Sequence, residues 1–257
     1  MNDYPSFRLD GQTALVTGAA RGLGRAISLA LADAGADVAL GLRVGTDAED
    51  LAAEIEGMGR RAHRVQMDLL DLDRIGAAVE EVRQAFGRID ILVNNAGIGP
   101  EEQAAEDWTE DDFDATFDLN VKGLFFASQA VARVMIEQGG GRIVNLGSQA
   151  GFIALPGEAI YCASKAAVSH LTKCHAVEWG QHGINVNAVA PTFIRTPGTE
   201  PMLADAAFKA DVEERIAALH RIGEPVDVAG AVVYLASPAS GLVTGTTLMV
   251  DGGWTAR

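Results

Sequence analysis

Short apolar runs alternate with longer amphipathic segments along most of the chain. From Gln12 onward the strand-like runs are TALVTG, DVALGL, HRVQMD, IDILVNNAG, GRIVNLGS, INVNAVAP and TLMVDGG. Such alternation predicts βαβ units, and therefore parallel strands joined by helices. Most of the runs are apolar at consecutive positions, as in strands that helices cover on both faces. The pattern therefore predicts a doubly wound α/β fold with right-handed crossovers.

Residues 191–224 interrupt this alternation. They separate a strand that ends near Ala190 from a helix expected to begin near Pro225, and the segment is longer than a usual strand-to-helix connection. A surface insertion is one interpretation; we favour a substrate lid over a site at the carboxyl ends of the strands. Because no linker, repeat or low-complexity tract divides the sequence, we expect residues 1–257 to form a single dinucleotide-binding and catalytic domain.

The charge balance of the chain is strongly acidic. Asp and Glu number 35 against 20 Lys and Arg, which gives a formal net charge of −15. Such a surface repels phosphate backbones and anionic lipids, so we expect neither a nucleic-acid partner nor a membrane partner. The chain shows no secretory leader and no run long enough to span a bilayer, and Cys162 and Cys174 are too far apart on one helix for a disulfide. We therefore expect a cytoplasmic protein with reduced thiols.

A glycine-rich turn follows the first strand-like run. In VTGAARGLG, Gly18, Gly22 and Gly24 permit a tight turn and close backbone approach just before a helix. The N–H groups and the positive dipole end of that helix are suited to a pyrophosphate. The position of the glycines directly after the first strand predicts a phosphate-binding turn.

A phenol and an amine lie on one face of a predicted helix. Tyr161 and Lys165, in YCASK, are four positions apart and can reach the same small volume. A nearby ammonium favours phenolate and lowers the pKa of a phenol toward the working range, so the pair can serve as a proton-transfer device for an alcohol or a carbonyl. Ser148 ends the run GRIVNLGS, where its hydroxyl is either an ordinary turn group or a hydrogen-bond donor to the substrate oxygen. Beside Tyr161 we favour the second interpretation.

These motifs, together with the NNAG run at Asn94–Gly97 and with Asn120, resemble in order and spacing the motif set of the short-chain dehydrogenase/reductase family. The resemblance covers nearly the whole chain, from about Gly11 to Asp251. It implies a Rossmann-type parallel sheet of about seven strands with helices on both faces, and hydride transfer between a nicotinamide and a carbonyl or alcohol carbon. It further implies that Asn120 kinks its helix and supports a water-linked proton relay. The catalytic residues that it implies are Asn120, Ser148, Tyr161 and Lys165.

The same resemblance implies the cofactor site. Lys165 would also bind the nicotinamide ribose, and Asp68 would accept from the adenine amino group, with a helix cap as the alternative role. The family usually has Gly after the proline of the sixth strand, whereas here Thr192 follows Pro191, which adds a hydroxyl beside the substrate. The expected cofactor-binding residues are Gly18, Arg21, Gly22, Leu23, Gly24, Arg43, Asp68, Leu69, Asn95, Ala96, Gly97, Tyr161, Lys165, Pro191, Ile194 and Thr196.

The end of the second strand decides between NADP and NAD. A carboxylate there would bind the ribose hydroxyls of NAD, but Leu42 occupies the family's acidic position and Arg43 follows it. Arg21 offers a second guanidinium to the same corner, and arginine accommodates the additional phosphate of NADP. We therefore favour NADP, with NAD possible if both arginines are simply solvated.

The pocket residues leave the substrate open. Those expected to surround it are Ser148, Gln149, Phe152, Ile153, Pro156, Glu158, Tyr161, Thr192, Phe193 and Arg195. A sugar, polyol or sugar acid would use Gln149, Glu158 and Arg195, whereas a cyclic ketone would use Phe152 and Phe193. The ending VDGGWTAR and the DILVNNAG region resemble sugar-acid dehydrogenases of the 2-deoxygluconate and gluconate types, and we favour this class. The alternatives are a reductase of 3-oxoacyl thioesters or cyclic ketones and a catalytically silent nucleotide-binding regulator; the acidic surface disfavours an acidic carrier protein.

Two further expectations concern metals and assembly. His170, His175 and His182 do not share one narrow helical stripe, so we expect no metal site. The segments DDFDATFDLNVKGLFFASQAVARVMIEQ and YCASKAAVSHLTKCHAVEWGQ carry more apolar surface than one sheet face requires. This excess, with the resemblance, predicts a homo-tetramer, although the sequence also allows a dimer.

Overall fold

Seven parallel strands form one sheet in this computed structural model, which describes residues 4–256. The spatial order is β3-β2-β1-β4-β5-β6-β7, and each neighbouring pair runs in parallel. The expected doubly wound sheet is therefore confirmed. The strands are β1 (Thr13–Thr17), β2 (Asp37–Leu42), β3 (Ala62–Gln66), β4 (Ile91–Asn94), β5 (Gly141–Leu146), β6 (Ile184–Pro191) and β7 (Thr247–Val250).

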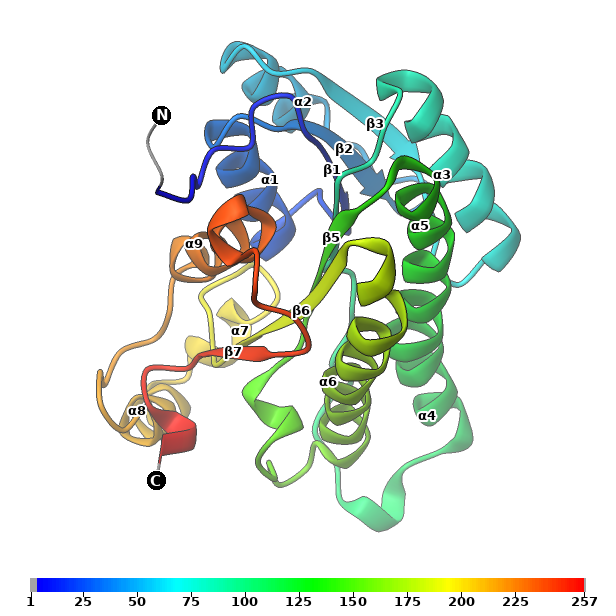
Figure 1. The fold of residues 1–257 in the computed structure, drawn as a ribbon. Coiled ribbons are helices and arrows are strands. Elements are labelled where there is room, and N and C mark those ends of the chain that lie inside the picture. Colours follow the sequence, from blue (N-terminus) through cyan, green and yellow to red (C-terminus); the bar gives the residue numbers. More distant parts are fainter. Residues whose placement is uncertain (1–3, 257) are drawn as a thin grey trace.

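Helices cover both faces of the sheet (Figure 1). One layer contains α1 (Gly22–Asp33), α2 (Glu49–Gly57) and α9 (Pro225–Ala236), and the other contains α3 (Leu72–Phe86), α4 (Glu110–Phe117), α5 (Leu124–Gln138) and α6 (Ala159–Trp179). A π-helical segment, Asp118–Gly123, joins α4 to α5. Short 3₁₀ turns lie at Ala105–Asp107, Gln149–Gly151, Gly180–His182, Pro238–Ser240 and Trp254–Ala256.

The alternation of side chains along each strand divides the core between the two faces. In β1, Ala14 and Val16 belong to the core under α1 and α9, whereas Leu15 belongs to the core under α3 and α5. Successive strand residues point to opposite faces, and both faces here are dry, which explains why the runs are apolar at consecutive positions.

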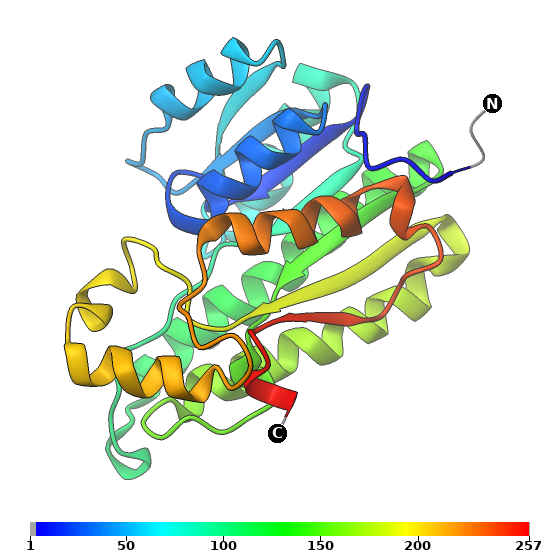
Figure 2. The ribbon, with the colours of Figure 1, turned by 90° about the vertical axis from the view of Figure 1, so that its left-hand side faces the viewer.

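The segment between β6 and α9 contains two helices of its own, α7 (Glu200–Leu203) and α8 (Ala206–Arg215). Both lie beyond the carboxyl end of β6 (Figure 2). Leu203, Val212 and Ile216 form a small separate core with Ile222 and Trp254. The insertion is thus a packed unit attached to the edge of the sheet where the strands end.

No helix in residues 4–256 is both long and apolar enough to cross a membrane.

Candidate active site

The glycine turn connects β1 to α1 in a conformation that favours glycine. Gly18 has φ +64° and Gly22 has φ +55°, both in the left-handed region. A Cβ on Gly24 would overlap the carbonyl oxygen of Gly18 and would crowd the Asn95 amide. The turn therefore lets the chain approach itself closely and leaves the N–H groups of the first turn of α1 directed outward for an anion.

The NNAG run braces this turn. The Asn95 side-chain amide donates to the carbonyl oxygens of Thr17 and Gly18 at 2.9 and 3.1 Å. In return, the Thr17 hydroxyl accepts from the N–H groups of Asn95 and Ala96 at 3.0 and 3.1 Å. The sequence predicted a cofactor-facing run here and missed this structural role, which makes the geometry of the glycine turn depend on the end of β4.

Asn120 lies in the π-helical segment and is 1% exposed. Its side-chain amide donates to the Ile98 carbonyl oxygen at 2.8 Å and to the Ser164 hydroxyl at 3.1 Å, and its oxygen accepts from the Ile98 N–H at 2.9 Å. The helix is π-helical at this position, where the sequence predicted a kink; such segments are frequent at functional sites. Asn120 thereby fixes the loop after the NNAG run against the helix that carries Tyr161.

Two glycines bring this loop close to the predicted catalytic residues. A Cβ on Gly97 would lie 3.0 Å from the Asn120 side-chain oxygen and 3.4 Å from Lys165 Nζ. A Cβ on Gly99 would lie 3.7 Å from the ring of Tyr161. The structure therefore gathers Asn120, Tyr161 and Lys165 around one backbone segment, although they are distant in sequence.

Ser148 and Lys165 are both held by local hydrogen bonds. The Ser148 hydroxyl accepts from the Ala150 N–H at 3.1 Å and is 3.3 Å from the side-chain oxygen of Gln149. Lys165 is 6% exposed; its Nζ donates to the Leu146 carbonyl oxygen at 2.9 Å and lies 5.7 Å from the centre of the Tyr161 ring. Lys165 is thus anchored at the end of β5, one helical turn from the phenol.

Burial dominates the acid–base properties of this pair. Desolvation raises the pKa of Tyr161 to about 12; a hydrogen bond with Ser148 opposes this rise and the charge of Glu158 adds to it. Desolvation lowers the pKa of Lys165 to about 8. The sequence predicted that Lys165 lowers the pKa of Tyr161, whereas in the protein alone burial is the largest influence on this pKa and Lys165 is not among the groups that shift it. Tyr161 is accordingly a phenol, the form that can donate a proton, at neutral pH.

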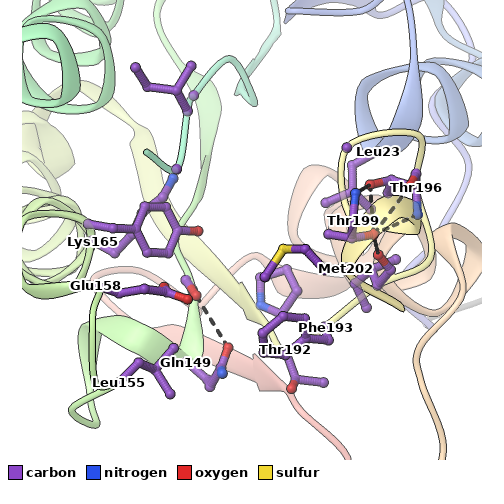
Figure 3. A pocket seen from close by; sticks show the side chains of 18 of the residues that line it. Leu23, Gln149, Leu155, Glu158, Lys165, Thr192, Phe193, Thr196, Thr199 and Met202 are labelled. Carbon is purple, nitrogen blue, oxygen red and sulfur yellow. Dashed lines mark hydrogen bonds between the residues drawn. The ribbon is translucent and has the colours of Figure 1, made fainter. Parts of the chain in front are cut away.

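One cavity of about 1070 Å³ joins the glycine turn to these residues. Figure 3 shows Gln149, Glu158 and Lys165 on one wall, with Phe193 and Met202 across the cavity. The predicted residues that line it are Arg21, Leu23, Asn95, Gly97, Ser148, Gln149, Glu158, Tyr161, Lys165, Pro191, Thr192, Phe193, Ile194 and Thr196. The volume is sufficient for a small ligand together with part of a larger one.

The loop after β6 closes the far side of the cavity. A Cβ on Gly22 would lie 3.5 Å from Cβ of Thr196, so this loop packs over the start of α1. The hydroxyl groups of Thr196 and Thr199 are 3.2 Å apart. The hydroxyl of Thr192, the residue in the family's glycine position, is buried without a hydrogen-bond partner in residues 4–256. The departure from the family pattern therefore places an unpaired polar group at the cavity.

Several residues expected around the substrate lie elsewhere. Phe152 is 50% exposed, Ile153 packs on the small core of the insertion, and neither they nor Pro156 line the cavity. Arg195 is also outside the lining, and its Nε donates to Glu224 at 3.2 Å. These residues lie close to the catalytic motifs in the sequence, but that closeness does not determine which way their side chains point.

Other lining residues were not expected from the sequence. They come from the loop after β4, from the segment before α6 and from the insertion, and they include Glu101, Glu102, Leu155, Thr199, Pro201, Met202, Asp205 and Phe208. The last five of these residues, from Thr199 to Phe208, belong to residues 191–224, so the prediction of a lid there could have indicated them.

The remaining predicted cofactor residues follow the ends of β2 and β3. Arg43 is exposed, and its guanidinium has no ion pair or hydrogen bond within the described part of the chain; Leu42 before it is 1% exposed and belongs to the core. Asp68 accepts from the Leu70 N–H at 3.0 Å, and Leu69 packs in the core. The alternative role of Asp68 as a helix cap is wrong, because Asp71 caps α3 by accepting from the Arg74 N–H.

These residues fit a dinucleotide. The glycine turn is a cradle that a Cβ would fill, and it opens a helix at the carboxyl edge of a parallel sheet, next to a cavity that contains a serine, a tyrosine and a lysine. The fold and this set of side chains define a nicotinamide-dependent oxidoreductase.

Comparison with known proteins agrees with this class. A family model described as enoyl-(acyl carrier protein) reductase matches residues 18–255. A 2-dehydro-3-deoxy-D-gluconate 5-dehydrogenase of Escherichia coli is 43% identical over 98% of each chain, and a 3-oxoacyl-[acyl-carrier-protein] reductase of Thermotoga maritima is 42% identical over 96% of this chain and 98% of that one. The crystal structure of a gluconate 5-dehydrogenase from Burkholderia cenocepacia in complex with NADP and tartrate matches with a TM-score of 0.94 at 38% identity, over 98% of both chains. The chain belongs to the short-chain dehydrogenase/reductase family.

Proposed function

We propose that this protein is an NADP-dependent dehydrogenase that interconverts a secondary alcohol and a ketone of the sugar, polyol or sugar-acid type. The observation that carries the proposal is the common cavity shared by the glycine turn, Ser148, Tyr161 and Lys165. A phosphate cradle and a proton-transfer set in one cavity are what hydride transfer to or from a carbonyl carbon requires. The gluconate-type relatives support the substrate class.

The chemistry divides among a few side chains. A bound nicotinamide dinucleotide would supply or accept the hydride. Tyr161 donates a proton to the carbonyl oxygen during reduction and removes it from the alcohol during oxidation, while the Ser148 hydroxyl hydrogen-bonds the same oxygen. Lys165, fixed by the Leu146 carbonyl oxygen, stabilises the phenolate and binds the nicotinamide ribose. Asn120 holds the loop at Ile98 and connects Lys165 to a water-linked proton path.

Other residues bind the dinucleotide. The turn from Gly18 to Gly24 would hold the pyrophosphate, braced by Asn95. Arg43 and Arg21 would bind the additional ribose phosphate of NADP, and the buried Leu42 gives the ribose of NAD no carboxylate. The remaining contacts of this proposed site come from Leu23, Asp68, Leu69, Ala96, Gly97, Pro191, Ile194 and Thr196.

We also propose how the chain is organised around this activity. The whole chain acts as one catalytic domain, and residues 191–224 form a lid over the substrate, since Met202 and Phe208 line the same cavity as the catalytic residues. The protein acts in the cytoplasm as a homo-tetramer.

A spectrophotometric screen tests the proposed function. The purified protein is assayed for nicotinamide reduction with NADP and with NAD against polyols, sugars, sugar acids and cyclic alcohols, and in the reverse direction with an acetoacetyl thioester. We expect oxidation of a hydroxylated substrate with a higher kcat/KM for NADP than for NAD. Turnover confined to the thioester would instead assign the protein to acyl-thioester reduction, and a lack of turnover despite bound NADP would favour the silent regulator.

A further inference from the structure

The substrate end of the cavity is acidic. Its lining includes Glu101, Glu102, Glu158 and Asp205. The cations in the lining, within residues 4–256, are Arg21 and Lys165. Arg21 is the N-cap residue of α1 at the glycine turn, and Lys165 is bound to the Leu146 carbonyl oxygen. Among the described lining residues, no further cation therefore remains to pair with a substrate carboxylate.

Glu158 is the acidic group closest to the chemistry. It precedes α6, three residues before Tyr161, and its charge contributes to the raised pKa of that phenol. Figure 3 shows its carboxylate directed into the cavity, between Lys165 and Gln149. Nothing in the described chain donates a hydrogen bond to this carboxylate, although its side chain is partly buried. A carboxylate that loses water without gaining a partner needs a donor from a ligand.

A second carboxylate reinforces this need. The Gln103 N–H donates to the Gly157 carbonyl oxygen at 3.1 Å, and a Cβ on Gly157 would lie 3.1 Å from Cβ of Glu102. The loop of Glu102 is thus packed against the loop of Glu158. Desolvation first, and then the charge of Glu102, raise the pKa of Glu158. Both carboxylates would repel an anionic substrate group, whereas a hydroxyl or an ammonium could donate a hydrogen bond to them.

Two other charged groups nearby are less available. Asp205 caps α8 by accepting from the N–H groups of Ala207 and Phe208 at 2.9 and 2.8 Å. Arg195, the cation expected to bind a sugar acid, is paired with Glu224 outside the cavity. Glu158 is consequently an unpaired acceptor next to Tyr161, and the Gln149 amide lines the same cavity.

We propose that Glu158 is a specificity-determining residue that selects a polyol without a carboxylate, neutral or amine-bearing, and rejects sugar acids. The inference rests on the proposed function and narrows it. Glu158 accepts hydrogen bonds from hydroxyl or ammonium groups on the carbons next to the reacting one, and Gln149 adds a neutral donor. In this respect the protein departs from relatives named for gluconate substrates.

A matched charge series tests this inference. D-gluconate, D-glucitol and D-glucamine share one hydroxylated skeleton and carry a carboxylate, a hydroxyl and an ammonium at the first carbon; shorter skeletons are tested with the same three end groups. With NADP at neutral pH, we expect kcat/KM to be higher for the neutral and cationic members than for the acid, by roughly tenfold or more. The reason is that Glu158 accepts a hydrogen bond from a hydroxyl or an ammonium and repels a carboxylate.

The variant Glu158→Gln should shrink this preference about tenfold, mainly by improving the acid and weakening the amine. The control Glu106→Gln removes the same charge from an exposed residue outside the cavity and should leave the order unchanged. A second measurement is independent of the substrate charge. Because Glu158 raises the pKa of Tyr161, its neutralisation lowers that pKa, leaves more phenolate at a given pH, and should shift the pH profile of oxidation to lower pH.

The outcomes separate the two proposals. If the carboxylate members are the best substrates, or if Glu158→Gln leaves both the charge preference and the pH profile unchanged, the inference is overturned while the dehydrogenase function stands. If no member of any skeleton is oxidised although NADP binds, the proposed function fails, and the inference fails with it.

Discussion

Replacing Tyr161 with Phe is expected to lower kcat for NADP-linked oxidation about 10²- to 10⁴-fold, the usual contribution of a positioned acid or base. The change removes the hydroxyl that exchanges the proton with the substrate. It keeps the aromatic ring, which lies beside Gly99 and under the ammonium of Lys165. The affinity for NADP, measured by quenching of intrinsic fluorescence, should stay close to that of the unmodified protein. A loss of kcat with retained binding would identify the phenol as the group that transfers the proton.

The matched control is Tyr234→Phe. Tyr234 lies on α9 beside Phe7, with ring centres 6.2 Å apart, and it does not line the cavity. This variant should retain full activity. Undiminished turnover by Tyr161→Phe under the same conditions would remove Tyr161 from the mechanism.

Replacing Arg43 with Ala is expected to lower kcat/KM for NADP roughly 10- to 100-fold and to leave kcat/KM for NAD nearly unchanged. The fold-change corresponds to the loss of hydrogen bonds between a guanidinium and a phosphate, each worth about 1.5–3 kcal/mol. Arg43 is exposed directly after β2, and its guanidinium has no partner within the part of the chain that the structure describes. Its loss should therefore cost little stability, and thermal unfolding of the variant should match that of the unmodified protein.

The control for Arg43 is Arg74→Ala. Arg74 is an exposed arginine near the start of α3, paired with Asp71, and it does not line the cavity. It should change neither cofactor preference nor turnover. Equal losses with NADP and NAD in Arg43→Ala would show that the residue does not read the ribose phosphate.

The fold could be predicted because its determinants are local. Consecutive apolar residues indicate strands buried on both faces, and the glycines of TGAARGLG indicate a turn that a Cβ would obstruct at Gly24. The carboxyl ends of parallel strands lie at one edge of the sheet, so the sequence could also predict that Ser148, Tyr161 and Lys165 line one cavity there.

The rest of the site depends on contacts between distant segments. The pKa of Tyr161 rises because the folded chain buries the phenol, an effect that the spacing of Tyr161 and Lys165 does not contain. Phe152 and Arg195 lie in loops whose direction is set by packing of the insertion and by the ion pair with Glu224. The brace between Asn95 and the glycine turn joins residues 77 positions apart, so local pattern could not predict it.

The most direct measurement follows deuterium from the reacting carbon of the alcohol that is oxidised fastest with NADP. If the protein transfers a hydride within this cavity, the deuterium appears in the reduced nicotinamide, the oxidation rate shows a primary isotope effect when chemistry limits it, and Tyr161→Phe forms little labelled cofactor. Deuterium released to solvent, or reduced cofactor that carries no label, would contradict the account.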